Sequence, residues 1–180
     1  MIALEWDGQS GMLEPEDIAL IAKLVGMLPQ DRDVQVIDLG AGTGTTALAV
    51  FRARSKGIWV VSVDVQRAAI EASDANMRQY GYWEYWLGIV SRSDVAGKSW
   101  GKVRVDLLLC DATHDYASQF DELAAWLPCM ERGGFIWVHD AYGRGGQIYP
   151  GVRMALDKFI QDGHLETIEE AGYSWAGRVL

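Results

Sequence analysis

Short runs of apolar residues alternate along this chain with longer amphipathic stretches. Four of these runs, at residues 34–39, 58–63, 103–110 and 135–138, have the composition of strands that are buried on both faces. A weaker, aromatic-rich strand is predicted at residues 82–90. Strands that are apolar throughout and separated by helices indicate a parallel sheet with helices on both faces. The sequence therefore predicts an α/β fold with a mostly parallel sheet.

Helical periodicity and end signals place helices between these strands. The predicted helices occupy residues 14–28, 45–54, 67–80, 116–130 and 152–160. A turn at residues 132–134 should precede the fourth buried strand, and residues 165–168 and 174–180 should close the fold as an antiparallel hairpin. Since 180 residues suit one domain, we expect a single domain over residues 1–180, with an N-terminal helical segment at 1–33.

Composition excludes several classes of protein. The formal net charge of −9 argues against a duplex nucleic-acid binder, because phosphate contacts require clustered Lys and Arg. The two cysteines, Cys110 and Cys129, form neither a disulfide framework nor a paired metal motif. There is no secretory signal at the N-terminus and no apolar run of membrane-spanning length. We therefore expect a cytoplasmic protein without a membrane partner.

Acidic residues lie at the ends of the predicted strands. Asp38 is in the last turn of its strand, while Asp64, Asp111 and Asp140 each follow one. A charge directly after a buried run is costly unless it meets solvent, a partner or a ligand. In open α/β sheets, ligands bind outside the carboxyl ends of the strands. The sequence thus predicts a ligand site at this edge of the sheet.

A glycine-rich loop joins the first predicted strand to the next helix. Gly40, Gly42 and Gly44 would let the backbone approach a ligand closely beside the unpaired N–H groups of a helix start. Loops of this kind bind nicotinamide, flavin or S-adenosylmethionine cofactors. A dinucleotide fingerprint needs glycines at positions one, three and six, but position six is Thr45. The observed spacing is one, three and five, preceded by Asp38.

The stretch at residues 36–44, an acid followed by three alternate glycines, resembles the first signature of class I S-adenosylmethionine-dependent methyltransferases. The resemblance implies a Rossmann-like fold, in which the loop lies beside the methionine and adenosine parts of the cofactor. It also implies that Asp64 accepts hydrogen bonds from the ribose hydroxyls and that Ser91 lies near the adenine. The cofactor-binding residues implied in this way are Asp38, Gly40, Gly42, Thr43, Gly44, Asp64, Val65, Ser91 and Asp111.

Residues 111–116 (Asp-Ala-Thr-His-Asp-Tyr), with Gly133-Gly134, His139-Asp140 and residues 149–153, resemble one branch of this family. The branch contains small-molecule and sugar O-methyltransferases (macrocin O-methyltransferase-like and methyltransferase 24-like). At the positions that correspond to residues 111–116, nitrogen and DNA methylases often carry Asn or Asp, two prolines and an aromatic residue instead. The resemblance implies that Asp111 and His114 are catalytic, with His114 as general base. It further implies a Mg²⁺-like metal on Asp111, His139 and Asp140.

Several alternatives stay open at this point. Metal-dependent sugar enzymes tend to have an acid where this chain has His139, and Mg²⁺ prefers oxygen ligands. A softer ion tolerates imidazole better, and a metal-free site is equally compatible. His114 could instead cap the following helix or bond to backbone. The aromatic residues of the 82–90 segment indicate sheet packing or a homodimer surface; these are Tyr82, Trp83, Tyr85 and Trp86.

The predicted function is S-adenosylmethionine-dependent O-methylation of a small hydroxylated metabolite or sugar. One alternative is a non-catalytic S-adenosylmethionine-binding subunit, because the N-terminal segment offers little sequence for a substrate lid. A second alternative is a nicotinamide-dependent oxidoreductase, which the mismatch at Thr45 disfavours.

Overall fold

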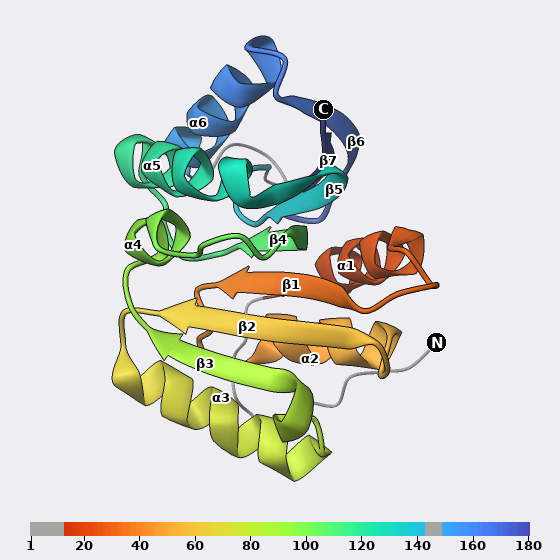
Figure 1. Ribbon diagram of the computed structural model, residues 1–180. Coiled ribbons are helices and arrows are strands. Elements are labelled where there is room, and N and C mark those ends of the chain that lie inside the picture. The colour runs from red at the N-terminus through yellow and green to blue at the C-terminus, as the bar shows by residue number, and fades with distance from the viewer. Residues whose placement is uncertain (1–12, 143–148) are drawn as a thin grey trace.

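The computed structural model describes residues 13–142 and 149–180, so residues 1–12 of the predicted N-terminal segment lie outside the described part. Within it, one seven-stranded sheet has the order β3-β2-β1-β4-β5-β7-β6 (Figure 1). Five strands are parallel, and β7 is antiparallel to both β5 and β6. The strands are β1 (Val34–Leu39), β2 (Ile58–Asp64), β3 (Trp86–Val90), β4 (Val105–Cys110), β5 (Met130–Val138), β6 (Leu165–Ala171) and β7 (Ser174–Val179).

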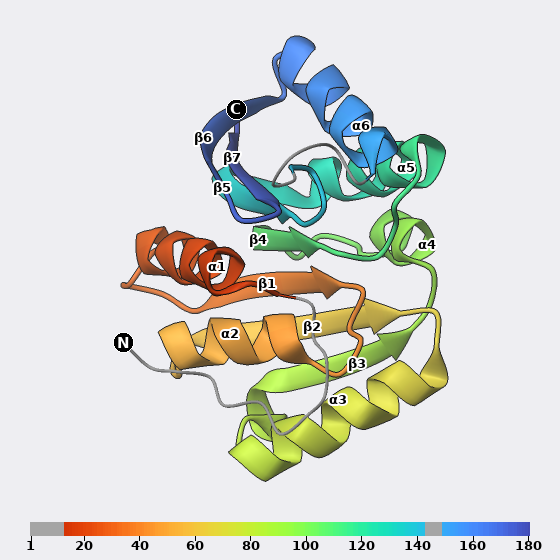
Figure 2. The ribbon, with the colours of Figure 1, turned by 180° about the vertical axis from the view of Figure 1, so that it is seen from behind.

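Two layers of helices cover the sheet (Figure 2). One layer contains α1 (Pro15–Met27), α2 (Thr45–Ala53) and α3 (Arg67–Tyr80), and the other contains α4 (Ser93–Lys98), α5 (Tyr116–Trp126) and α6 (Pro150–Gln161). Along β1, Val36 belongs to the first core cluster and Ile37 to the second. This double burial explains why the central strands are apolar throughout. The predicted Rossmann-like α/β fold is confirmed. In the residues described, no helix has both the length and the apolar composition to cross a membrane.

Three predicted boundaries are wrong for local reasons. Residues 83–85 form a 3-10 turn, so β3 begins only at Trp86. The helix predicted to reach residue 130 ends at Trp126, because Pro128 cannot continue it. The predicted turn at residues 132–134 is instead a bulge inside β5, where the partner of Val105 is Met130 and that of Leu107 is Phe135. The short helix α4 was not predicted at all.

The sheet brings the carboxyl ends of β1, β2, β4 and β5 to one edge. The register pairs Leu39 with both Val63 and Cys110, and Cys110 in turn with Val138. The residues that follow these strands are therefore neighbours across the sheet. From β1 the chain adds strands toward one edge of the sheet (β2, β3), and from β4 it adds them toward the other. Ligands bind at such a switch point, here between β1 and β4, in open α/β sheets.

Candidate active site

The glycine loop between β1 and α2 adopts a backbone conformation that needs glycine. Gly40, Gly42 and Gly44 have φ values of 89°, 50° and 87°, which side chains disfavour. A Cβ atom at Gly40 would lie 2.2 Å from the backbone oxygen of Asp111, so the loop also packs directly against the end of β4. The loop is thus a fixed turn rather than a flexible connection.

Helix α3 holds this loop from one side. The Ser73 hydroxyl donates to the carbonyl of Gly42 at 3.2 Å, and the Asn76 amide donates to that of Thr43 at 2.7 Å. Sequence reasoning missed both residues, because polar positions on an amphipathic helix are usually exposed. Ser73 is fully buried, and its position turns an ordinary helix face into a support for the loop.

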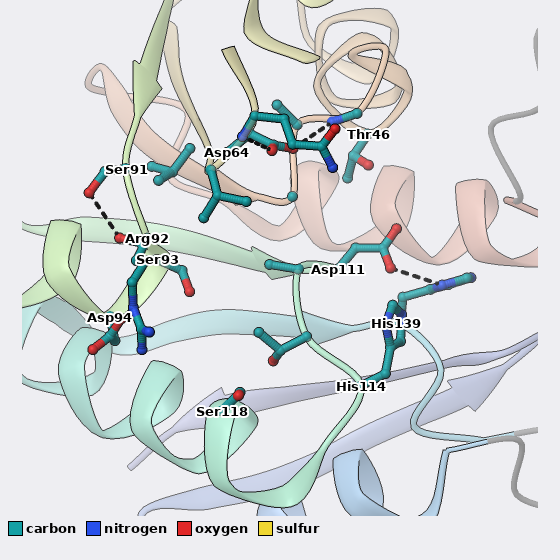
Figure 3. A pocket seen from close by; sticks show the side chains of 18 of the residues that line it. Thr46, Asp64, Ser91, Arg92, Ser93, Asp94, Asp111, His114, Ser118 and His139 are labelled. Carbon is teal, nitrogen blue, oxygen red and sulfur yellow. Dashed lines mark hydrogen bonds and ion pairs between the residues drawn. The ribbon is translucent and has the colours of Figure 1, made fainter. Parts of the chain in front are cut away.

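A cavity of about 590 Å³ lies beside the loop, at the carboxyl edge of the sheet (Figure 3). Gly40, Asp64 and residues 91–94 are among the residues that line it, and the labelled Asp111, His114 and His139 lie together away from Ser91. Ten of the sequence-predicted residues line the cavity and two do not. Those that line it are Gly40, Gly42, Thr43, Asp64, Val65, Ser91, Asp111, His114 and the His139-Asp140 pair; Asp38 and Gly44 do not.

Asp64 ends β2 and faces the glycine loop. One carboxylate oxygen accepts from the backbone N–H of Gly42 at 3.2 Å, and the other accepts from that of Gln66 at 2.8 Å. Its backbone oxygen accepts from the N–H of Ser91 at 2.9 Å, which joins the loop side of the cavity to the residues before α4. Val65 beside it is 62 % exposed and lines the cavity. The carboxylate is therefore held in place and still open to the cavity.

Asp38 lies beneath the loop rather than in the cavity. It is fully buried, and its Oδ2 accepts a hydrogen bond from the Ser62 hydroxyl at 2.7 Å. The Trp86 indole donates to the same Ser62 oxygen at 2.8 Å. Burial raises the pKa of Asp38 to about 7, although the Ser62 hydrogen bond opposes this shift. The predicted role of Asp38 in cofactor binding stays a prediction.

Two imidazoles and two carboxylates meet at the far end of the cavity. Nδ1 of His139 lies 3.2 Å from Asp111 Oδ1 and 3.5 Å from Asp140 Oδ2, and Nε2 of His114 lies 3.0 Å from the same Asp140 oxygen. Asp140 has a φ of 57°, a conformation that few residues other than glycine adopt. Local strain of this kind concentrates at functional sites. The backbone thus turns directly after β5 and presents both residue 139 and residue 140 to the cavity.

His139 is buried, with 6 % of its surface exposed. Burial alone would lower its pKa, but contacts with the carboxylates of Asp111, Asp140 and Asp17 outweigh burial and raise the pKa of His139 to about 12. The pKa of Asp140 is lowered: burial opposes the shift, and contacts with His139 and His114 outweigh it. Without a bound cation, a positively charged imidazole therefore balances the surrounding carboxylates.

His114 is more accessible, with 43 % of its side chain exposed. Its ring lies 4.4 Å from that of Tyr149, between ring centroids. The alternative that His114 caps the next helix is wrong, because Asp115 caps α5 by accepting from the N–H of Ser118 at 3.0 Å. His114 is thus free to meet a molecule in the cavity.

The donor set of the predicted metal site is compatible with a divalent ion. One ligand atom from each of Asp111, His139 and Asp140 lies within 4.8 Å of the others, so a single ion could contact all three. Two carboxylate oxygens and one imidazole nitrogen suit a borderline ion better than Mg²⁺. Metal binding itself stays a prediction.

The aromatic segment before β3 divides into packed and exposed residues. Tyr82 stacks on Phe51 with 4.7 Å between ring centroids, and Trp86 is anchored by Ser62, which confirms sheet packing for both. Trp83 is 48 % exposed and Tyr85 is 37 % exposed. Their role in a homodimer surface stays a prediction.

A buried acid on α5 makes stability depend on pH. Glu122 is fully buried, and this burial raises its pKa to about 7. Between pH 4.5, the ordinary pKa, and pH 7, the folded protein holds more protons than the unfolded chain, so stability falls as pH rises.

We expect Glu122→Gln to remove this loss of stability with rising pH. Its free energy of unfolding relative to wild type should rise by about 3 kcal/mol between pH 5 and pH 8. Urea unfolding at both pH values measures the change. The exposed neighbour Asp121 provides the control, since Asp121→Asn should keep the wild-type pH dependence. A constant difference between Glu122→Gln and wild type would contradict a neutral Glu122.

Comparison with known proteins places this site in a family. The Methyltransferase domain family (Methyltransf_24) matches residues 37–141, which include the glycine loop and the Asp111 and Asp140 edge. A release factor glutamine methyltransferase from Gloeobacter violaceus is 39 % identical over 70 residues, a stretch that covers 39 % of this chain and 24 % of that protein. The chain therefore matches only about a quarter of that curated relative.

Known structures share the fold at low sequence identity. Cofactor-bound Rv0187 from MTB has a TM-score of 0.78 at 14 % identity, covering 95 % of this chain and 83 % of that one. SMU.1697c from Streptococcus mutans, in complex with SAH, has a TM-score of 0.70 at 13 % identity, covering 93 % and 100 %. The O-methyltransferase from Bacillus cereus, also in complex with SAH, has a TM-score of 0.66 at 11 % identity, covering 94 % and 93 %. The chain belongs to the Methyltransferase domain family, and it shares its fold with these structures, two of which are in complex with SAH.

Proposed function

We propose that this methyltransferase transfers the methyl group of S-adenosylmethionine to a hydroxyl oxygen of a small metabolite or sugar. The observation that carries the proposal is the group formed by Asp111, His114, His139 and Asp140 at the end of the cavity that begins at the glycine loop. It combines an accessible base with a donor set for a cation. A hydroxyl needs its proton removed as the methyl group arrives, and both features serve that need.

His114 is proposed to take the proton of the acceptor hydroxyl. Nε2 of its ring faces Asp140 Oδ2 at 3.0 Å. If Nε2 carries the hydrogen and donates it to Asp140, Nδ1 keeps a lone pair and can accept a proton. Asp140 then stabilises the charged ring that forms. The exposure of His114 leaves its ring within reach of a molecule in the cavity.

Asp111, His139 and Asp140 are the residues that would hold a divalent ion. Such an ion, when bound, would polarise the acceptor hydroxyl and lower the free energy of its ionised form. The same three residues would fix the position of the acceptor relative to the glycine loop. Asp140 lies 3.5 Å from His139 and 3.0 Å from His114, which supports a shared role.

An amide acceptor is less well supported. The Gloeobacter violaceus relative is named a glutamine methyltransferase, but it matches only 70 residues of this chain. Nitrogen methylases often carry two prolines after the fourth strand, and this chain has Ala112-Thr113 after Asp111. Membership of the methyltransferase family also decides against a nicotinamide-dependent oxidoreductase. The accessible His114 favours a catalytic protein over a cofactor-binding subunit.

The charged side chains that line the cavity limit the class of acceptor molecule that it can bind. Four acids line it, Asp64, Asp94, Asp111 and Asp140, against two cations, His139 and Arg92, the second of which is paired with Asp94 at 2.9 Å. Like charges in a partly closed site repel an anionic ligand. We therefore favour an uncharged hydroxylated acceptor.

The helices and strands extend over the whole described chain around one sheet, which supports one methyltransferase domain over residues 1–180.

Product analysis tests this proposal directly. Purified protein would be incubated with S-adenosylmethionine and three groups of acceptors: catechols and flavonoids, free or glycosidic sugars, and amines or glutamine peptides. Mass spectrometry would locate the added methyl group, with parallel reactions in EDTA. We expect oxygen-methylated products from the first or second group. Methylation of nitrogen alone would overturn the proposal, whereas EDTA resistance would remove only the metal.

The role of Asp64 in cofactor binding has its own test. Asp64→Ala should weaken S-adenosylhomocysteine binding by about 1.5–3 kcal/mol, because a carboxylate that accepts from a ligand hydroxyl contributes a charge-assisted contact. Isothermal titration of both proteins measures the difference. Asp74→Ala, an acid on α3 paired with Arg78, is the matched control and should bind like wild type. Unchanged affinity in folded Asp64→Ala would remove Asp64 from the site.

A further inference from the structure

A buried carboxylate from α1 lies behind the candidate active site. Asp17 is fully buried, and its Oδ1 accepts from the backbone N–H of Tyr173 at 2.9 Å and from the Ser174 hydroxyl at 2.6 Å. Its Oδ2 accepts from the N–H of Glu14 at 2.9 Å and lies 3.5 Å from Nε2 of His139. Asp17 thus connects the first helix, the turn between β6 and β7, and His139.

The position of this carboxylate is fixed by close packing. A Cβ atom at Gly172 would lie 2.5 Å from Oδ1 of Asp17, so the hairpin turn closes directly over the carboxylate. The hydrogen bonds to Tyr173 and Ser174 use Oδ1. Oδ2 is therefore the oxygen that faces His139, and it does so from a rigid support.

The His139 ring has two different surroundings. Nδ1 faces the cavity side, with Asp111 and Asp140 at 3.2 and 3.5 Å, while Nε2 faces away from the cavity toward Asp17. The rings of Trp137 and Tyr173 lie beside it, at centroid distances of 5.5 and 6.3 Å. With 94 % of its surface buried between these neighbours, the ring has little freedom to turn.

A histidine can bind a metal ion only through a nitrogen that carries no hydrogen. Metal-bound histidines usually donate the other ring N–H to a carboxylate, which fixes the tautomer and the ring orientation. Nε2 of His139 is buried and has no hydrogen-bond partner among the described residues, and the carboxylate oxygen beside it is Oδ2 of Asp17 at 3.5 Å. A small approach of these two atoms would place Asp17 where that carboxylate lies and leave Nδ1 for the ion.

We infer that Asp17 is a positioning residue that presents Nδ1 of His139 as a metal ligand, and that the site prefers Mn²⁺, Co²⁺ or Zn²⁺ to Mg²⁺. The inference deepens the metal site of the proposed function and rests on it. Mg²⁺ binds mainly oxygen and keeps several waters, whereas imidazole suits the borderline ions. Asp17 lies outside residues 37–141, the part matched by the family, so this support comes from the N-terminal helix of the chain itself.

Metal titration without turnover tests this inference. Mn²⁺, Zn²⁺ and Mg²⁺ would be titrated by calorimetry, and Co²⁺ by its visible absorption, which reports a nitrogen ligand. Wild type should bind Mn²⁺ or Zn²⁺ at least about tenfold more tightly than Mg²⁺. Asp17→Asn can keep an acceptor for Tyr173 and Ser174 but replaces Oδ2, so it loses the acceptor that faces His139 and the one for the Glu14 N–H. It should weaken Co²⁺ and Mn²⁺ binding by about 10–100-fold and leave S-adenosylhomocysteine affinity unchanged.

Ser174→Ala is the matched control, because it removes one hydrogen bond from the same carboxylate and leaves the His139 contact. Its stability should fall and its metal affinity should stay at the wild-type value. In a His139→Ala background, adding Asp17→Asn should change metal affinity no further, since Asp17 acts through the imidazole. Equal losses in Ser174→Ala and Asp17→Asn would overturn the positioning role.

His139→Asp tests the ion preference independently of Asp17. It converts the site to three carboxylates, and the ratio of Mn²⁺ to Mg²⁺ affinity should fall by about tenfold or more. An unchanged ratio, or a wild-type protein that prefers Mg²⁺ or binds no ion, would overturn the inference. O-methylated product formed in EDTA together with absent metal binding would overturn the inference and leave the proposed function intact.

Discussion

Replacing Gly40 by alanine should abolish binding of S-adenosylhomocysteine. Gly40 has a φ of 89°, and a Cβ atom there would lie 2.2 Å from the backbone oxygen of Asp111 and 2.6 Å from its carbonyl carbon. Both contacts are with backbone, so no side-chain rotation relieves them. The loop and the end of β4 must separate, and both line the cavity. Isothermal titration should show at least about a 100-fold loss of affinity, or 2.7 kcal/mol or more.

A control substitution at a second glycine distinguishes the effect of this clash from that of backbone strain alone. Gly81 ends α3 with a φ of 79°, and a Cβ atom there would meet no atom within 4 Å. Gly81→Ala should therefore lose about 1–2 kcal/mol of stability from the left-handed conformation alone and bind S-adenosylhomocysteine like wild type. Circular dichroism would confirm that both variants are folded. Wild-type affinity in Gly40→Ala, or an equal loss in Gly81→Ala, would contradict the packing argument.

The glycine loop could be predicted because its signal is local. A strand, three alternate glycines and a helix start are adjacent in the sequence, and each glycine proved to need a positive φ. Asp64, Asp111, His139 and Asp140 are far apart in the sequence, but a parallel sheet brings the residues after its strands to one edge. Predicting the strands was therefore enough to predict that these residues line one cavity.

The buried position of Asp17 could not be predicted from the residues next to it in the sequence. Its sequence position indicates only a favourable charge in the first turn of a helix, whereas its partners Tyr173 and Ser174 lie more than 150 residues away along the chain. Only the packing of α1 against the β6–β7 turn buries it beside His139. Helix α4 was missed for a different reason, because its six residues are too few to establish a periodicity.

His114→Ala should lose turnover and keep the cofactor. If His114 accepts the hydroxyl proton, its removal should lower kcat by about 10²–10⁴-fold. S-adenosylhomocysteine affinity should not change, because His114 lies with Asp140 and Tyr149, at the end of the cavity away from Ser91. Rates with the acceptor found by product analysis, together with calorimetry, measure both quantities.

A loss of kcat without a loss of S-adenosylhomocysteine affinity is the result expected of a general base. His164→Ala is the matched control: it removes an imidazole from the exposed turn between α6 and β6, and its kcat should equal that of wild type. A His114→Ala protein with a wild-type kcat would contradict the role. A parallel loss of cofactor affinity would instead make His114 a wall of the cofactor cavity. Since Asp140 orients the His114 ring at 3.0 Å, Asp140→Asn should lower kcat in the same direction but less, because an amide oxygen can still accept from Nε2.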